Sequence, residues 1–303
     1  MSGHQYQFAL ILSEHLQRTI NIQHVRAVGG GCINQTYLLE SGSGEQWFAK
    51  TNYPDQQAMF AAEMAGLQEI YHSHTLRCPK PLTHGTTTGT ESDFSYLIME
   101  YISFGHNHNR AQTQRSAGQQ LAALHCCTQE QFGWHMDNTI GSTAQLNGYR
   151  DGWVTFWREQ RLLPQLKWAL QDGYNQRDYE NGLKLCEQLS VFFHDYQPPA
   201  SLLHGDLWSG NIGFTEAGQP VIFDPAVYYG DRETDLAMTE MFGGFSADFY
   251  AAYHEQWPID KGYSVRKKLY QLYHILNHYH LFGGGYGHQA SNTVLQLLSE
   301  TGS

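Results

Sequence analysis

Paired cysteines are missing from this chain of 303 residues. It holds five cysteines, an odd number, and no two of them stand as a Cys-x-x-Cys pair. Such a set predicts neither a disulfide framework nor a zinc site built from cysteine. We interpret the 17 histidines as surface or packing residues rather than as zinc ligands.

Long apolar runs are also missing. No stretch of about 18 apolar residues occurs, so no membrane-spanning helix is predicted. Residues 1–7 are polar and lack the basic-then-apolar layout of a secretory signal. We therefore expect a cytoplasmic protein that does not enter a membrane.

Basic residues are scarce, with 18 Lys and Arg against 29 Asp and Glu and a formal net charge of -11. A negative surface repels phosphate groups, so neither nucleic acid nor an anionic membrane is expected as a partner. The composition leaves the oligomeric state open.

What the chain does contain predicts a globular protein with two lobes. Hydrophobic residues make up 41% and aromatic residues 14%, and the length allows a large core. Residues 1–102 predict a small N-lobe, and residues 103–303 predict a mainly helical C-lobe. In the N-lobe we predict helices over 8–19 and 56–71 and strands over 23–28, 36–40, 46–51, 79–83 and 94–102. In the C-lobe we predict helices over 110–127, 151–172, 179–194, 246–256 and 265–282.

One polar segment, residues 203–211, carries the chemistry. It contains Asp206 and, five residues later, the amide of Asn211. The apolar run 220–223 predicts a short buried strand that ends at a second carboxylate, Asp224, with a turn at 216–218 before it. Phosphoryl transfer needs a base that orients the attacking hydroxyl, together with an Asn and an Asp that hold magnesium ions. We therefore predict Asp206 as the catalytic base, and Asn211 and Asp224 as Mg²⁺ ligands.

A second group of residues is typical of a nucleotide site. Gly29, Gly30 and Gly31 lie between the first two predicted strands, where glycines let the backbone approach phosphate closely. Lys50 ends the third strand, in the manner of the lysine that contacts the α- and β-phosphates of ATP and is aligned by a helix glutamate. Glu63 is the first candidate for that glutamate and Glu69 the alternative. The backbone of the hinge, at Glu100, Tyr101 and Ile102, is expected to bind adenine.

Taken together, these segments resemble the fructosamine kinase (ketosamine 3-kinase) family, among the aminoglycoside-phosphotransferase-like kinases. The resemblance extends over nearly the whole chain, with further marks at residues 137–141, 153–166, 223–226, 229–238 and 281–287. It implies an α+β, bilobal, protein-kinase-like fold with a small β-rich N-lobe and a mainly helical C-lobe.

The resemblance also implies an activity. ATP would phosphorylate the 3-hydroxyl of a ketosamine of the fructosamine or ribulosamine type, which is the adduct of a sugar and an amine. The 3-phosphate breaks down and frees the amine, so the reaction amounts to deglycation. ATP and Mg²⁺ are the implied cofactors, and small-molecule ketosamines or glycated amines are the implied partners. Trp208 would form an apolar wall for the sugar, His204 is assigned to the substrate as well, and Asp235 is interpreted as a structural carboxylate that braces the catalytic loop.

Cys32 lies in the glycine loop, where backbone N–H groups can lower a thiol pKa. It is a candidate for a redox-sensitive thiol, and a small neutral filler is the alternative interpretation.

Two departures from protein kinases limit the analogy. Pro225 and Ala226 stand where those enzymes have a Phe-Gly switch, and Gly205 replaces an arginine that binds an activation-loop phosphate. No phosphorylation-controlled activation loop is expected. An aminoglycoside- or choline-type phosphotransferase is the alternative function, and a nucleotide-binding pseudokinase is disfavoured because Asp206 and Lys50 are intact. Trp208 favours the ketosamine kinase.

Overall fold

The computed structural model describes residues 3–29, 33–88, 93–105 and 109–302. The chain forms two compact units: unit 1 comprises residues 1–108 and 214–223, and unit 2 comprises residues 109–213 and 224–303. The predicted division after residue 102 differs from this one, because a segment from late in the chain joins the first unit.

Unit 1 is built on one antiparallel sheet with the strand order β1-β2-β3-β5-β4. Its strands are β1 (Ile22–Ala27), β2 (Gln35–Ser41), β3 (Gln46–Asn52), β4 (Pro81–Thr86) and β5 (Ser95–Glu100). The first three predicted strands agree with β1 to β3 to within one residue at each end. The β2–β3 hairpin turns at Gly44, which has φ +84°, a conformation that favours glycine.

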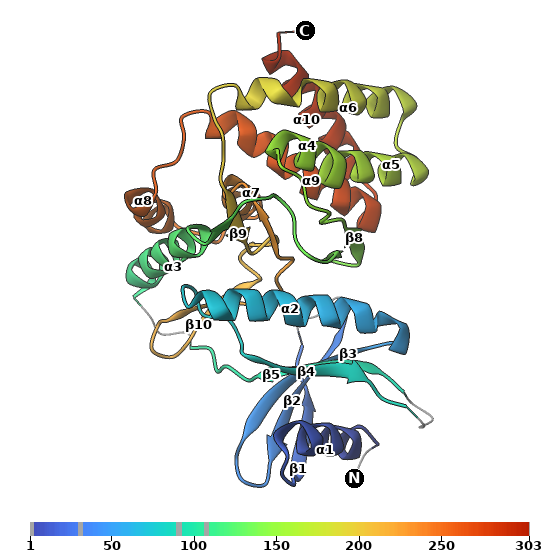
Figure 1. The fold of residues 1–303 in the computed structure, drawn as a ribbon, viewed down its shortest axis with the longest axis vertical. Helices are drawn as coiled ribbons and strands as arrows, with labels where there is room; N and C mark the ends of the chain where they lie inside the picture. The colour runs from blue at the N-terminus through green and yellow to red at the C-terminus, as the bar shows by residue number, and fades with distance from the viewer. Residues whose placement is uncertain (1–2, 30–32, 89–92, 106–108, 303) are drawn as a thin grey trace. The chain divides into compact units, whose positions relative to one another are not determined.

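Two helices cover the two faces of this sheet, α1 (Gly3–Leu16) and α2 (Gln57–Ser73), and a short 3₁₀ turn, Pro54–Gln56, precedes α2. Phe8 of α1 packs in one core with Trp47 and Ala49 of β3. Because side chains alternate along a strand, Lys50 points to the other face, where it meets α2. Figure 1 shows α1 and α2 on opposite sides of the strands.

The returning segment 214–223 runs from the last residue of β10 (Ile212–Phe214) through the predicted turn and the strand β11 (Pro220–Ile222). Gly218 turns it with φ +79°. Its attachment to unit 1 is by backbone: Ile222 donates to the carbonyl of Arg77 at 2.9 Å, and Gly105 donates to the carbonyl of Phe214 at 2.9 Å. This strand pairing explains why the segment belongs to unit 1.

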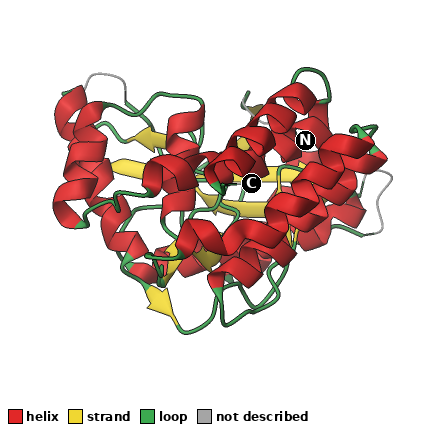
Figure 2. Ribbon diagram, turned by 90° about the horizontal axis from the view of Figure 1, so that it is seen from above, coloured by secondary structure: helices red, strands yellow, loops and turns green. Residues whose placement is uncertain are grey.

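Unit 2 is mainly helical, and Figure 2 shows the prevalence of helix over strand in the chain. The long helix α9 (Tyr263–Phe282) is largely buried and packs against α7, α5 and α10. A small antiparallel sheet has the order β12-β9-β6, and β7 pairs with β8. The remaining elements are α3 (Arg110–His125), α4 (Trp153–Phe156), α5 (Leu163–Gln171), α6 (Gln176–Gln188), α7 (Glu233–Met241), α8 (Ala247–Gln256), α10 (Tyr286–Glu300), β6 (Thr128–Gln129), β7 (Asn138–Ile140), β8 (Thr143–Gln145), β9 (Ala200–Leu203) and β12 (Tyr228–Gly230).

The predicted helices differ in part from those of the structure. The predicted helix 151–172 contains a π-helical stretch, Trp157–Leu162, and the predicted helix 179–194 ends in a 3₁₀ turn, Leu189–Phe193. The helices α7 and α10 were not predicted. Within the described residues no helix combines the length and apolarity needed to cross a membrane.

Candidate active site

The predicted catalytic loop, residues 204–211 of unit 2, begins where β9 ends. All four residues of β9 are buried, and His204 follows them with no exposed surface. The His204 ring turns back on the loop, because its Nδ1 accepts a hydrogen bond from the backbone N–H of Asp206 at 3.2 Å. The buried strand and this hydrogen bond therefore fix the position of the Asp206 backbone.

Asp235 is hydrogen-bonded to the backbone of this loop. Its carboxylate accepts the backbone N–H of His204 at 2.8 Å and that of Gly205 at 2.9 Å. Burial alone would raise the pKa of Asp235, but hydrogen bonds from His125 and the loop hold it below the usual value. An ionised carboxylate thus accepts hydrogen bonds from two backbone donors of the loop. The bracing role of Asp235 in catalysis stays a prediction.

His125, at the end of α3, supports Asp235 in turn. It is fully buried, its Nε2 lies 3.1 Å from Asp235, and its Nδ1 lies 2.7 Å from the hydroxyl of Tyr253. Burial lowers the pKa of His125 and keeps the ring neutral. Because Asp235 can only accept, we assign the proton to Nε2. The sequence analysis missed this residue, which lies 110 positions from its partner.

Gly205 is required by both conformation and space. It has φ +84°, and a Cβ built on it would lie 2.0 Å from the carbonyl oxygen of Ala226. The backbone N–H of Ala226 bonds the carbonyl of His204 at 2.8 Å. The catalytic loop and the segment after Asp224 therefore lie in direct backbone contact, and a side chain at position 205 would separate them.

Asn211 is tied to Asp206. Its Nδ2 donates to the Asp206 carbonyl at 2.9 Å and to Oδ2 of the Asp206 carboxylate at 3.2 Å. This donation fixes the orientation of the amide and leaves Oδ1 as the atom suited to a cation. The structure thus brings together two of the three residues predicted for phosphoryl transfer.

Asp224, the third residue predicted for phosphoryl transfer, acts on Asp206 through its charge. Burial first, and then the negative charge of Asp224, raise the pKa of Asp206 to about 7. Asp224 itself has φ +57°, in the left-handed region that is uncommon for residues other than glycine. Two carboxylates and an amide oxygen are hard oxygen donors, and a divalent cation between them would relieve the repulsion. The residues present therefore fit Mg²⁺.

A second brace holds the segment after Asp224. Gln145, buried at the end of β8, donates to the carbonyl of Ala226 at 3.0 Å and accepts from the hydroxyl of Tyr273 at 2.9 Å. Asn138 of β7 donates to the next carbonyl, that of Val227, at 2.8 Å. These amides were not predicted as functional, although Asn138 lies in a segment that carried the family resemblance. What marks both amides in the structure is that each is buried and donates to a backbone carbonyl close to Asp224.

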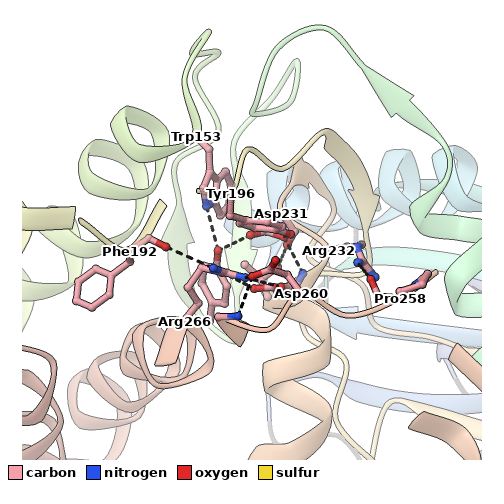
Figure 3. A network of polar contacts seen from close by, with 12 residues as sticks. Trp153, Phe192, Tyr196, Asp231, Arg232, Pro258, Asp260 and Arg266 are labelled. Atoms are coloured by element: carbon pink, nitrogen blue, oxygen red, sulfur yellow. Dashed lines mark hydrogen bonds and ion pairs between the residues drawn. The ribbon is translucent and has the colours of Figure 1, made fainter. Parts of the chain in front are cut away.

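The turn before α7 is anchored by a buried charged network (Figure 3). Asp231 accepts the hydroxyl of Tyr196 at 2.9 Å, and Arg266 forms two bonds to Glu233 at 2.7 and 2.9 Å. Both carboxylates are fully buried, and an unpaired charge there would be costly. The network fixes the first turn of α7, and with it the carboxylate of Asp235.

In unit 1 the predicted ion pair is present. Lys50 Nζ lies 2.5 Å from Oε1 of Glu63, and their side chains are 6% and 11% exposed. Both side chains are thus nearly buried, and Lys50 lies within a strand that is paired on both sides. Glu63, the first candidate, is thus a partner of Lys50. The contact of Lys50 with ATP stays a prediction.

The other nucleotide residues are placed only in part. Gly29 is described and exposed, whereas Gly30, Gly31 and Cys32 lie outside the described residues. At the hinge, the backbone N–H of Glu100 already donates to the carbonyl of Lys80 at 2.8 Å. Tyr101 and Ile102 follow the end of β5, and the contact of these three residues with adenine stays a prediction.

The two predicted substrate residues differ in exposure. The side chain of Trp208 is 39% exposed and can meet a substrate, whereas His204 is 0% exposed. A ring with no exposed surface cannot form the wall of a site. We correct the assignment of His204 to a residue that positions the backbone of Asp206.

Comparison with known proteins identifies the family of this chain. A family model described as fructosamine kinase matches residues 5–300. The chain belongs to the fructosamine kinase family. It is 46% identical over 289 residues to a protein of Synechocystis sp. described as a probable ketoamine kinase, with 95% of this chain and 94% of the relative covered. It is 40% identical over 284 residues to the chloroplastic protein-ribulosamine 3-kinase of Arabidopsis thaliana, covering 93% and 84%.

Solved structures support the family and its fold. A candidate fructosamine-3-kinase from Haemophilus somnus 129PT has a TM-score of 0.85 at 25% identity, covering 98% of this chain and all of that one. The aminoglycoside phosphotransferase APH(4)-Ia, 14% identical with a TM-score of 0.63 and covering 95% and 98%, shares the fold alone. The predictions of the family, of an α+β kinase-like fold and of an ATP-dependent phosphotransferase are confirmed.

Proposed function

We propose that this member of the fructosamine kinase family transfers the γ-phosphoryl group of ATP to the 3-hydroxyl of a ketosamine. The observation that carries the proposal is the Asp206 carboxyl, which is bonded by Asn211, faces the charge of Asp224 and has its pKa raised to about 7. A base with a pKa near the working pH can both take up and release a proton.

The residues of unit 2 would act as follows. Asp206 accepts the proton of the sugar hydroxyl while the oxygen forms its bond to phosphorus and the bond from phosphorus to ADP breaks. Asn211 and Asp224 hold Mg²⁺, which supplies charge neutralisation for the phosphates when it is bound. Trp208 presents an exposed ring to the apolar face of the sugar.

Unit 1 would supply the phosphate contact. Lys50 is kept in place by Glu63, and its ammonium group can bond the α- and β-phosphates of ATP. The product, a ketosamine 3-phosphate, breaks down and frees the amine, so the activity would serve deglycation. The choice between free and protein-bound substrates, the cytoplasmic location and the redox role of Cys32 stay predictions.

The test is an ADP-release assay with fructosamine, ribulosamine and erythrulosamine substrates, with product position read by ³¹P-coupled NMR. We expect phosphorylation at the 3-hydroxyl by the wild type and none by Asp206→Ala. Equal turnover by both proteins would overturn the catalytic assignment. Turnover of aminoglycosides or choline alone would overturn the substrate and leave the mechanism intact.

A further inference from the structure

An exposed row of aromatic rings starts at the catalytic loop of unit 2. The ring centroids of Trp208 and Phe242 lie 6.1 Å apart, and those of Phe242 and His278 lie 5.4 Å apart. From His278 the row continues to Phe282 at 5.6 Å and to Tyr286 at 5.1 Å. We call these five residues the aromatic row.

The row is a surface feature rather than a core. Phe242 is 45% exposed and Phe282 67% exposed, beside the 39% of Trp208. Exposed phenylalanines are unfavourable in water, and a contiguous group of them marks a place where something binds. The members come from the catalytic loop, the end of α7, the last turns of α9 and the start of α10, so the fold rather than one helix gathers them.

The backbone holds the first two rings in place. A Cβ on Gly210 would lie 2.2 Å from the Trp208 ring, so the ring packs flat against this glycine. Gly244 has φ +100°, and a Cβ on it would lie 2.3 Å from the Cβ of Ser209. The turn after α7 therefore packs on the catalytic loop, and this contact sets Phe242 beside Trp208.

We propose that Phe242 and Phe282, the two exposed phenylalanines of the aromatic row, bind the amine substituent of the ketosamine. This inference rests on the proposed function, because it takes the sugar hydroxyl to lie at Asp206. In a ketosamine only three carbon atoms separate the 3-hydroxyl oxygen from the amine nitrogen. A substituent on that nitrogen must then leave the site close to Trp208, and Phe242 is the next ring.

The chemistry of the row matches that substituent. The amine of a ketosamine is protonated near neutral pH, and aromatic faces attract such a cation while they cover its alkyl or aryl chain. Asp206, two residues before Trp208, places a carboxyl group at that end of the row. The row would therefore favour ketosamines with a long or aromatic amine over those with a small one.

The experiment measures kcat/KM for two fructosamine substrates, one made from methylamine and one from benzylamine. The proteins are the full-length wild type and the variants Phe242→Ala, Phe282→Ala and Leu295→Ala. Leu295 is the control, an exposed apolar residue of α10 outside the row, 51% exposed. We expect Phe242→Ala to lower kcat/KM for the benzylamine substrate about 10-fold more than for the methylamine substrate, the scale of a lost aromatic contact. Phe282→Ala should lower the same ratio less, and Leu295→Ala should leave it unchanged.

The possible failures are distinct. If the wild type phosphorylates neither substrate, the proposed function is wrong and the inference falls with it. If the wild type phosphorylates both but Phe242→Ala and Phe282→Ala leave the ratio of the two kcat/KM values unchanged, the inference alone is wrong. A second copy of the chain is the other molecule that the row could bind, and size-exclusion chromatography of the same proteins tests this. If the wild type is a dimer, Phe282→Ala is a monomer and the ratio of the kcat/KM values is unchanged, the row binds a second copy.

Discussion

Nε2 of His125 lies 3.1 Å from Oδ2 of Asp235, and neither side chain is more than 1% exposed. The same carboxylate bonds the backbone of the catalytic loop. A residue of α3 thus acts on Asp206 through one intermediate side chain.

We expect His125→Ala to lower kcat by about 10- to 100-fold, the scale seen when a residue that orients a catalytic ligand is removed. His125→Gln, which keeps a donor for Asp235, should recover part of the loss. Steady-state kinetics with ATP and the ketosamine will show whether kcat falls while both KM values change little. A lower Tm with unchanged kcat would mean that His125 serves stability alone.

The raised pKa of Asp206 makes a prediction about stability. A carboxyl whose pKa is higher in the folded state than in the unfolded chain stabilises the fold below the unfolded value, and this contribution is lost as the pH rises to about 7. Asp206→Asn removes the charge and should therefore raise Tm more at pH 8 than at pH 5. Thermal unfolding at the two pH values measures the difference, and an equal change at both would contradict it.

The same group predicts the pH dependence of the rate. The proton acceptor is the carboxylate, so kcat should rise with pH through the pKa of Asp206. Bound Mg²⁺ should shift this rise below pH 7, because a cation favours the charged form of a nearby carboxyl. Rate profiles at low and saturating Mg²⁺ will test this, and superimposable profiles would show that Asp206 and the metal do not interact.

Gln145 is expected to affect the metal. Gln145→Ala removes the donor that holds the carbonyl of Ala226, two residues after Asp224, and should raise the Mg²⁺ concentration for half-maximal rate about 10-fold. Gln165 offers a matched control, a fully buried glutamine that donates to Asn277. Gln165→Ala should lower Tm without changing the Mg²⁺ requirement. An equal change in both variants would point to a general loss of packing.

The ion pair of unit 1 is expected to affect both the stability of the fold and the binding of ATP. Lys50→Met removes the cation that pairs with the buried carboxylate of Glu63, which should cost about 3 kcal/mol of unfolding free energy. It should also raise the KM for ATP. Glu63→Gln keeps a hydrogen-bonding partner and should be milder in both respects, and Lys184→Met, at an exposed lysine, is the control. An unchanged KM for ATP in Lys50→Met would remove Lys50 from the nucleotide site.

Several features of this protein follow from the sequence by itself. The sequence predicted strands that agree with β1 to β3 to within one residue at each end, and the spacing of Asp206, Asn211 and Asp224 predicted a catalytic set. These features depend on neighbours in the chain, since turns, strand alternation and short loops are local. The pairing of Lys50 with Glu63 also followed, because a single strand-to-helix connection joins them.

Only the tertiary structure decided which distant groups support the site. The helix α7 was missed because its residues 233–239 are all buried, polar ones included, so the helix shows no alternation between an apolar and a polar face. His125 and Gln145 look like ordinary polar residues until the fold places them against Asp235 and Ala226. A buried polar group must find a partner, and that partner is determined by the packing of elements far apart in the chain rather than by the residues next to it.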